Sequence, residues 1–278
     1  MTLKIALPNK GSLSDPAIEV FKAAGFRQRQ DNKDLIFLDP SNDVEFYYLR
    51  PRDIATYVGN GELDLGVTGR DLLEDSESVA IELLDLDFGR STFRLAAPAG
   101  VGAGQKIEGS RIATAYPNLL AKFLRDRGVS AEIVHLDGAV ESAVGLGVAD
   151  LIADVVSTGS TLRQAGLVVV DEPILESSAI LIARKEKREF DLVVRRLQGV
   201  VIARQYVLVD YDVTRSNLER ACEITPGIES PTISPIQKAD WVAVRAMVPR
   251  REVHHVMDRL YEVGARGILV SDIHACRL

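Results

Sequence analysis

The stretch Leu151-Ile-Ala-Asp-Val-Val-Ser-Thr-Gly-Ser-Thr-Leu162 joins a run of apolar residues to a turn rich in hydroxyl groups. The apolar residues are typical of a buried strand, and one acid, Asp154, lies among them. The glycine lets the backbone turn tightly and directs consecutive N–H groups and hydroxyls toward one small volume, which suits a phosphate. An acid just before such a turn can hold ribose hydroxyls, directly or through a metal ion. The candidate phosphate-binding residues are Ser157, Thr158, Gly159, Ser160 and Thr161.

The same stretch also fits a strand followed by a Ser/Thr/Gly loop that only caps the next helix. Its surroundings bear on the choice, because strand and helix patterns alternate from residue 3 to about residue 199. This alternation predicts largely parallel sheets with helices on both faces. The last helix of this part is predicted over Phe190–Leu197, with Gln198-Gly199 ending it.

Two lobes are predicted within this first part, with the chain crossing near Arg90 and returning near Glu172. A hinged cleft between two such lobes would resemble that of type II periplasmic-binding proteins. Residues 1–90 and 173–200 are assigned to lobe I, and residues 91–172, which include the phosphate-type loop, to lobe II.

From residue 200 onward the pattern changes to strand, helix, strand, strand, helix, strand. A strand is predicted over Val201–Tyr211, and later strands over residues 230–236, 240–248 and 266–274. This βαββαβ order is the ferredoxin-like arrangement. Residues 201–278 are therefore predicted to form a separate, ACT-like domain.

Strand ends nominate further residues for the cleft. In an open α/β sheet, residues at the carboxyl ends of parallel strands line the crevice. Lys10, Arg50, Arg70 and Asp71 each follow a predicted strand. The glycine run Gly100-Val-Gly-Ala-Gly104 lacks the G-x-G-x-x-G spacing, and no G-x-x-x-x-G-K-[ST] occurs in the sequence, so neither common nucleotide fingerprint applies.

Composition narrows the class of protein. The 278 residues are 46% hydrophobic and 26% charged, as in a soluble globular protein. The net charge of −7 argues against nucleic-acid binding as the main role. No apolar span is long enough to cross a bilayer or to serve as a signal peptide, so no membrane partner is expected and a cytoplasmic location is the default expectation. Cys222 and Cys276 lie far from any metal-ligand spacing and are expected to be free thiols.

The sequence resembles the ATP phosphoribosyltransferase family, long form, whose members catalyse the first step of histidine biosynthesis. The opening stretch resembles the loop that binds phosphoribosyl diphosphate (PRPP) in phosphoribosyltransferases. The resemblance rests on that stretch and on Ala6–Gly11, Leu49–Asp53, Thr68–Leu72, Ala113–Asn118, Leu136–Glu141 and Gly227–Thr232, in the family's order.

The resemblance implies a glycosyltransferase that transfers the 5-phosphoribosyl group of PRPP to N1 of ATP and releases pyrophosphate, with Mg²⁺ as cofactor. It implies that Lys10, Arg50 and Asp71 bind ATP or pyrophosphate, while Asp154 and the loop bind PRPP. It makes the C-terminal domain a regulatory one that binds histidine as a feedback inhibitor, through Asp212, Ser230 and Thr232. AMP as a second inhibitor and a homo-oligomer between dimer and hexamer are also implied.

Other interpretations stay open at this point. A non-catalytic two-lobed sensor of small anions would explain the architecture without a reaction. A phosphoribosyltransferase that acts on a free base would explain the loop. Glu141 could hold ribose or metal, or could be an ordinary acid on a helix surface. Asp212 could simply precede a helix cap, with Ser230 and Thr232 at an ordinary strand start.

Overall fold

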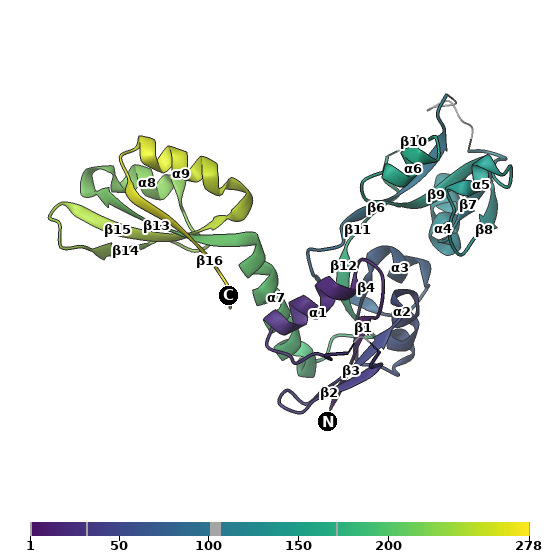
Figure 1. The fold of residues 1–278 in the computed structure, drawn as a ribbon, viewed down its shortest axis with the longest axis horizontal. Coiled ribbons are helices and arrows are strands. Elements are labelled where there is room, and N and C mark those ends of the chain that lie inside the picture. The colour runs from purple at the N-terminus through teal and green to yellow at the C-terminus, as the bar shows by residue number, and fades with distance from the viewer. Residues whose placement is uncertain (1, 32, 101–106, 171, 278) are drawn as a thin grey trace. The chain divides into compact units, whose positions relative to one another are not determined.

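The computed structural model describes residues 2–31, 33–100, 107–170 and 172–277. The chain divides into two compact units, one made of Met1–Lys22 and Phe26–Phe190, the other of Asp191–Leu278 and Ala23–Gly25. The first unit contains two six-stranded sheets, each the centre of an α/β lobe, and the second contains one four-stranded sheet (Figure 1). Most of the glycine run at 100–104 falls in 101–106 and lies outside the described residues.

The sheet of lobe I has the strand order β2-β3-β1-β4-β12-β5. Alternate residues of its central strands face opposite helices. Phe46 of β3 meets Phe21 of α1 at a ring-centroid distance of 5.5 Å, whereas Ala6 of β1 packs with Ile54 and Val58 of α2. The two helices therefore cover opposite faces, as the alternation predicted. The elements are β1 (Leu3–Pro8), α1 (Ser14–Ala23), β2 (Ile36–Asp39), β3 (Val44–Leu49), α2 (Pro51–Asn60), β4 (Leu65–Gly69), α3 (Arg70–Asp75), β5 (Ile81–Asp85) and β12 (Ala179–Ala183).

Lobe II repeats this plan with the strand order β10-β6-β9-β7-β8, and β11 also pairs with β6. Leu120 and Leu124 of α4 pack with Leu95 on one face, and Leu162 of α6 packs with Ile152 on the other. The elements are β6 (Ser91–Pro98), β7 (Arg111–Thr114), α4 (Pro117–Arg127), β8 (Glu132–His135), α5 (Ser142–Gly145), β9 (Leu151–Val156), α6 (Ser160–Gln164), β10 (Leu167–Val169) and β11 (Leu175–Ser177).

The sheets are mixed rather than largely parallel, and here the sequence prediction was wrong in detail. β1, β3 and β4 are parallel, as are β7, β8 and β9. In each sheet, however, one inner strand runs antiparallel to its neighbours: β12 between β4 and β5, and β6 between β9 and β10. The reason is topological, because β6 and β12 are the strands with which the chain enters each lobe from the other. This is the arrangement of type II periplasmic-binding proteins, as predicted.

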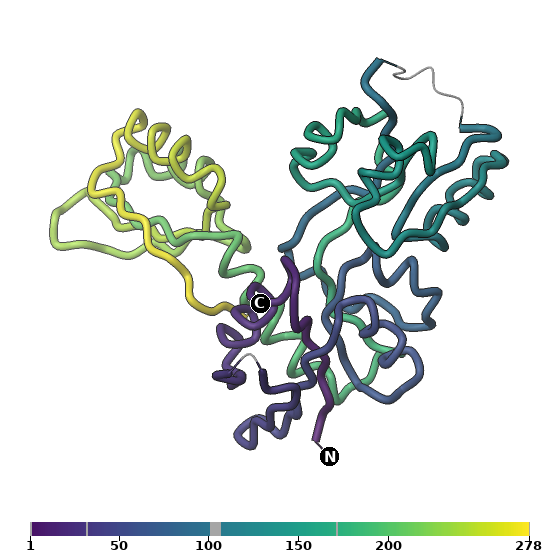
Figure 2. Tube along the Cα trace, turned by 45° about the vertical axis from the view of Figure 1, so that its right-hand side comes forward, coloured from purple at the N-terminus to yellow at the C-terminus, as the bar shows by residue number. Residues whose placement is uncertain are grey.

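Two segments carry the chain between the lobes and lie side by side (Figure 2). The Ala179 N–H donates to the carbonyl of Phe88 at 2.8 Å, and the Leu86 N–H donates to the carbonyl of Ala179 at 2.9 Å. The guanidinium of Arg70 pairs with Glu82 at 2.8 Å and with Asp85 at 3.1 Å. These bonds fix the crossing segments against lobe I.

The second unit begins with α7 (Asp191–Gln205) and continues with 3₁₀ turns and a βαββαβ sequence. The sheet order β14-β15-β13-β16 is antiparallel throughout, which confirms the ferredoxin-like prediction. The expected helix end at Gly199 is wrong, since α7 runs on to Gln205 and β13 starts at Tyr206. The elements are β13 (Tyr206–Thr214), α8 (Leu218–Ile224), β14 (Thr232–Pro235), β15 (Trp241–Pro249), α9 (Val253–Glu262) and β16 (Arg266–Asp272).

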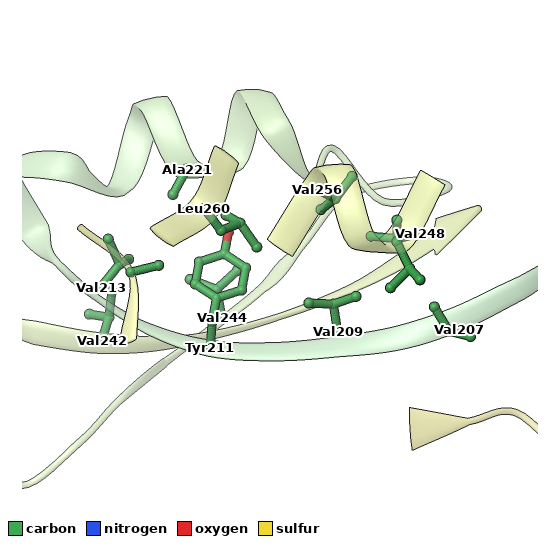
Figure 3. Close-up of a cluster of buried hydrophobic side chains, with 12 residues drawn as sticks. Val207, Val209, Tyr211, Val213, Ala221, Val242, Val244, Val248, Val256 and Leu260 are labelled. Atoms are coloured by element: carbon green, nitrogen blue, oxygen red, sulfur yellow. The ribbon is translucent and has the colours of Figure 1, made fainter. Parts of the chain in front are cut away.

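The core of this sheet lies between its strands and the helices α8 and α9 (Figure 3). Every second residue of β13 points into it, and Tyr211 is the largest of these side chains. Its hydroxyl lies 2.7 Å from Oγ1 of Thr225, which in turn donates to the carbonyl of Ala221. Burial raises the pKa of Tyr211 to about 12. The hydrogen bond gives the one polar atom of this side chain a partner inside an apolar core.

Candidate functional site

The residues after four parallel strands meet at the cleft face of the first unit. Lys10 follows β1, Asp71 follows β4, Tyr116 follows β7 and Ser157 follows β9. Because β1 and β4 are parallel in one lobe and β7 and β9 in the other, each pair of strands ends at one edge of its sheet. The local sequence therefore delivers polar side chains from both lobes to one region.

The hydroxyl-rich loop has the geometry that its glycine predicted. Gly159 has φ +68°, a left-handed conformation that favours glycine, and α6 begins directly after it at Ser160. The side chains of Ser157, Thr158, Ser160 and Thr161 are exposed, and the Thr158 and Ser160 hydroxyls lie 3.1 Å apart. The loop thus turns its hydroxyls to solvent rather than into packing, as a phosphate-binding loop requires.

A cavity of about 320 Å³, which we call the tyrosine cavity, lies between this loop and lobe I. Its lining combines two cations, one carboxylate, a phenol and several small or hydroxyl-bearing residues. Among the lining residues are Lys10, Gly11, Asp71, Tyr116, Ser157 and Ser177.

A second cavity of about 650 Å³, the arginine cavity, lies on the other side of the loop. Ser157, Arg90, Ser91 and Ser177 line both cavities. The arginine cavity is also lined by the next two residues of the turn and by three further guanidinium groups. These further residues include Thr158, Gly159, Arg70, Arg94 and Arg163.

A hydrogen-bond network fixes Asp71 in the tyrosine cavity. The Ser177 hydroxyl donates to Oδ1 of Asp71 at 2.7 Å and accepts from the Asp71 N–H at 3.1 Å. The Tyr116 phenol, from lobe II, lines the same cavity and interacts electrostatically with this carboxylate. Burial, followed by the charge of Asp71, raises the pKa of Tyr116, so the phenol keeps its proton. Asp71 therefore joins groups from both lobes and from a crossing strand.

Asp154 is a carboxylate in a poorly solvated position. Burial raises its pKa to about 6, and the charges of Glu141 and Asp71 act in the same direction, opposed by a hydrogen bond from the Val155 N–H. A bound cation or a hydrogen-bond donor would relieve this penalty. Such perturbed carboxylates are common in functional sites.

The other candidate residues are distributed as follows. Arg50 is exposed just before α2 and lines neither cavity, although the next residue, Pro51, lines the tyrosine cavity. Asp154, Ser160, Thr161 and Glu141 also line neither cavity, and Glu141 precedes α5. No group of three or more His, Cys, Asp or Glu side chains that could hold a metal is found within the described ranges.

In the ferredoxin-like sheet, Asp212 lies in β13 opposite Ala243 of β15, and Thr232 lies in β14 opposite Arg245. Asp212 is half-buried, whereas Ser230 and Thr232 are exposed. Oδ2 of Asp212 lies 3.7 Å from the position that a Cβ on Gly267 would occupy, so β16 approaches closely here.

Sequence reasoning missed Tyr116, Ser177, Arg94 and Arg163 as site residues, although it nominated Arg70. Ala113–Asn118 served only as part of the family resemblance, although the position of Tyr116 after a parallel strand was the same signal that nominated Asp71. Arg163 could have been found from the loop itself. Its Nη1 lies 3.4 Å from the position that a Cβ on Gly159 would occupy.

The fold and the site define a two-lobed α/β protein with a cleft suited to phosphate groups and a C-terminal ferredoxin-like domain. No helix in the described part of the chain is long and apolar enough to cross a membrane. The family model described as ATP phosphoribosyltransferase matches residues 50–200, and the model described as HisG, C-terminal domain, matches residues 203–275.

Relatives with similar sequences are also named ATP phosphoribosyltransferase. The ATP phosphoribosyltransferase of Pseudarthrobacter chlorophenolicus is 56% identical, over 99% of this chain and 100% of its own length. That of Streptomyces coelicolor is 55% identical over the same shares. A chain of the ATP phosphoribosyl transferase (HisG:HisZ) complex from Thermotoga maritima has a TM-score of 0.63 and 29% identity, over 72% of this chain and 98% of that one. This chain belongs to the ATP phosphoribosyltransferase family.

Proposed function

We propose that this chain transfers the 5-phosphoribosyl group of PRPP to N1 of ATP, giving phosphoribosyl-ATP and pyrophosphate, the first step of histidine biosynthesis. The observation that carries the proposal is the exposed hydroxyl loop after β9, whose first residue, Ser157, lines one cavity with Lys10 and Asp71 of the other lobe. Membership of the ATP phosphoribosyltransferase family supports the identity of both substrates.

The reaction requires alignment more than proton transfer. The bond from N1 of the adenine to C1 of the ribose forms as the bond from C1 to the pyrophosphate oxygen breaks. N1 carries no proton, so no general base is needed. Holding two large anions in one geometry can lower the activation free energy by several kcal/mol. In well-oriented cases this contribution is of the order of 7–11 kcal/mol. A cleft that binds both substrates can therefore provide much of the catalysis.

We assign the loop residues Ser157, Thr158, Gly159, Ser160 and Thr161 to the 5-phosphate of PRPP. Backbone N–H groups around Gly159 and the exposed hydroxyls would donate to the phosphate oxygens. Lys10, Arg50 and Asp71 would position ATP or pyrophosphate, with Lys10 supplying charge and Asp71 a fixed acceptor.

Asp154 would hold the ribose hydroxyls of PRPP and, together with the substrate's pyrophosphate, a Mg²⁺ ion. Its donor chemistry fits a metal ion, because burial disfavours the charged form of this carboxylate and a bound cation would stabilise it. Mg²⁺ on the pyrophosphate would neutralise charge that develops on the leaving group. With no three-ligand cluster in the described part of the chain, most of its ligands would come from substrate and water.

The loop assignment predicts a difference between the two substrates. Thr158→Val and Thr161→Val remove hydroxyls without changing side-chain size, so they should raise the KM for PRPP about tenfold and the KM for ATP much less. Thr92→Val, a lining position outside the loop, is the matched control. Equal effects on both substrates would argue against the loop as the PRPP site.

The activity itself is tested by pyrophosphate release. Release from PRPP should depend strictly on ATP and should stop when ATP is replaced by a free base. Release with adenine alone would indicate a transferase for free bases, and binding of both anions without turnover would indicate a sensor.

We further propose that histidine inhibits the enzyme through the C-terminal domain, which we take as residues 201–278, with residues 1–90 and 173–200 as lobe I and 91–172 as lobe II. Asp212 would accept a hydrogen bond from the charged amine or imidazole, with Ser230 and Thr232 as neutral partners. Asp212→Asn should weaken inhibition about tenfold or more at unchanged basal turnover. Inhibition as strong as in the unmodified chain would exclude Asp212.

A further inference from the structure

A buried carboxylate at the contact between helices α3 and α4 has no role in the reaction as proposed above. Asp75, the last residue of α3, is only 4% exposed. Its Oδ1 accepts the N–H groups of Asn118 at 3.0 Å and Leu119 at 3.1 Å, both in the first turn of α4. The Asn118 side chain donates in return to the Asp75 carbonyl at 2.8 Å. One residue of lobe I thus caps α4, the first helix of lobe II.

Arg52 of α2 completes this contact. Its Nη1 pairs with Oδ2 of Asp75 at 2.7 Å, and its Nη2 donates to the carbonyl of Ala115 at 2.8 Å. The guanidinium carbon lies 4.9 Å from the centre of the Tyr116 ring. We call Arg52, Asp75 and Asn118 the clasp.

The clasp holds both ends of the short segment that carries Tyr116. Ala115 is bound through its carbonyl and Asn118 through its N–H and its side chain. Tyr116 itself lies against the Arg52 guanidinium, and it lines the tyrosine cavity together with Asp71. Asp71 and Asp75 lie at opposite ends of α3, so one six-residue helix presents both the partner of the phenol and the anchor of its backbone.

We propose that Asp75 is a positioning residue for phosphoribosyl transfer: by anchoring the start of α4 it keeps the Tyr116 phenol beside Asp71 in the tyrosine cavity. A buried ion pair is weak evidence for stability as such, because desolvation offsets much of the attraction. Its fixed geometry, by contrast, is well suited to hold an active-site group, since small displacements there are costly to catalysis.

A matched control lies one residue away. Glu74 of α3 pairs with Lys122 of α4 at 2.8 Å across the same contact, but Lys122 is exposed and Glu74 is partly exposed. This pair links the same two helices without touching the Ala115–Asn118 segment. Exposed pairs of this kind contribute little to stability. Glu74→Ala therefore removes an ion pair between the lobes but leaves the segment that carries Tyr116 intact, so it measures the effect of losing such a pair alone.

The experiment uses the full chain and two readouts. For Asp75→Ala we expect kcat/KM for ATP-dependent pyrophosphate release to fall about 10- to 100-fold, and amide exchange of residues 115–122 to accelerate. Glu74→Ala should leave both readouts within about twofold of the unmodified chain. Should Asp75→Ala not fold, Asn118→Ala removes a single bond of the clasp and must shift both readouts in the same direction.

A double-mutant cycle separates positioning from stability. Tyr116→Phe should lower kcat/KM, and Asp75→Ala in that background should cost clearly less than it does alone, because both changes act on one hydroxyl. Multiplicative effects, or an Asp75→Ala variant with the kcat/KM of Glu74→Ala, would overturn the proposal. The kinetic readout rests on the proposed function, whereas amide exchange does not. Absence of activity in the unmodified chain would thus refute the function, and unchanged exchange in Asp75→Ala would refute the clasp.

Discussion

The half-buried, poorly solvated carboxylate of Asp154 should make the unliganded protein less stable at neutral pH than a neutral side chain would. Its pKa of about 6, against an ordinary value of 3.8, corresponds to about 3 kcal/mol at 1.36 kcal/mol per pKa unit. Asp154→Asn removes the charge and keeps an oxygen that can accept the Val155 N–H. We therefore expect this variant to be more stable than the unmodified chain above pH 6, by up to about 3 kcal/mol.

The sign follows from the order of the two pKa values. Below the unfolded pKa of 3.8 the carboxyl is protonated in both states and imposes no penalty. Between 3.8 and about 6 the unfolded chain loses the proton while the folded chain keeps it, so the free energy of unfolding falls as pH rises. Above about 6 the penalty is complete and constant. The advantage of Asp154→Asn should therefore appear between these values and stay level above them.

Urea unfolding of both proteins, followed by circular dichroism between about pH 4 and pH 8, measures this difference. Asp150→Asn is the matched control. Arg111 donates to the Asp150 carboxylate from Nη2 at 2.8 Å and from its backbone N–H at 2.9 Å, and these bonds lower the pKa of Asp150. Loss of this carboxylate should thus destabilise the protein at neutral pH, with an effect that fades in acid, the opposite sign to Asp154.

The stabilised variant should also be a poor enzyme. If Asp154 holds ribose hydroxyls and a metal ion, its neutral replacement should raise the KM for PRPP and reduce the stabilisation that PRPP with Mg²⁺ gives to the folded chain. An Asp154→Asn protein that is no more stable than the unmodified chain at pH 8 would refute the reasoning, because the carboxylate would then be adequately solvated.

Two further predictions concern packing and the crossing segments. Gly66→Ala in β4 should destabilise the protein by about 1–3 kcal/mol in urea unfolding, since its Cβ would lie 2.5 Å from Cγ2 of Ile54. Gly138→Ala, with nothing within 4 Å, should be neutral. Arg70→Lys keeps the charge but loses the paired bonds to Glu82 at 2.8 Å, so it should cost about 1–2 kcal/mol in the same assay. A neutral Arg70→Lys would show that these bonds do not hold the crossing segments.

Local pattern was a good guide wherever a property depends on neighbouring residues. The left-handed glycine at 159 and the exposed hydroxyls around it were implied by Ser157–Thr161 itself. Strand ends also placed Lys10 and Asp71 correctly at one cavity, because parallel strands end together whatever lies between them in sequence.

Long-range contacts explain what local pattern could not supply. The sequence predicted that a helix ends at Gly199, yet this residue lies inside α7. The position favours glycine because a Cβ there would overlap the carbonyl of Cys276, which is distant in sequence. The directions of β6 and β12 depend on how the chain passes between lobes, which alternation alone does not specify. Tyr116 shares the strand-end position of Asp71, but its support by Arg52 and Asp75 depends on contacts between distant parts of the chain.

A protein with a net negative charge can bind two polyanions if the acidic side chains near its cleft are paired with basic ones. Arg70 and Arg90 reach the arginine cavity, but their charge is matched by Glu82, Asp85 and Asp87. These cations mainly hold the crossing segments in place. The side chains of Lys10 and Arg163 differ, since neither has a hydrogen bond or an ion pair with any other residue that the structure describes.

The capacity for a negative ligand therefore resides in these two side chains and in the donors around Gly159, whatever the net charge of −7. Since exposed charges are screened by salt while backbone N–H groups are not, substrate binding should depend on ionic strength less steeply than the number of arginines in the cavity suggests. On the proposed assignment of the loop, we expect the cleft to select phosphates mainly through the fixed donors that converge there and only secondarily through the cations around it.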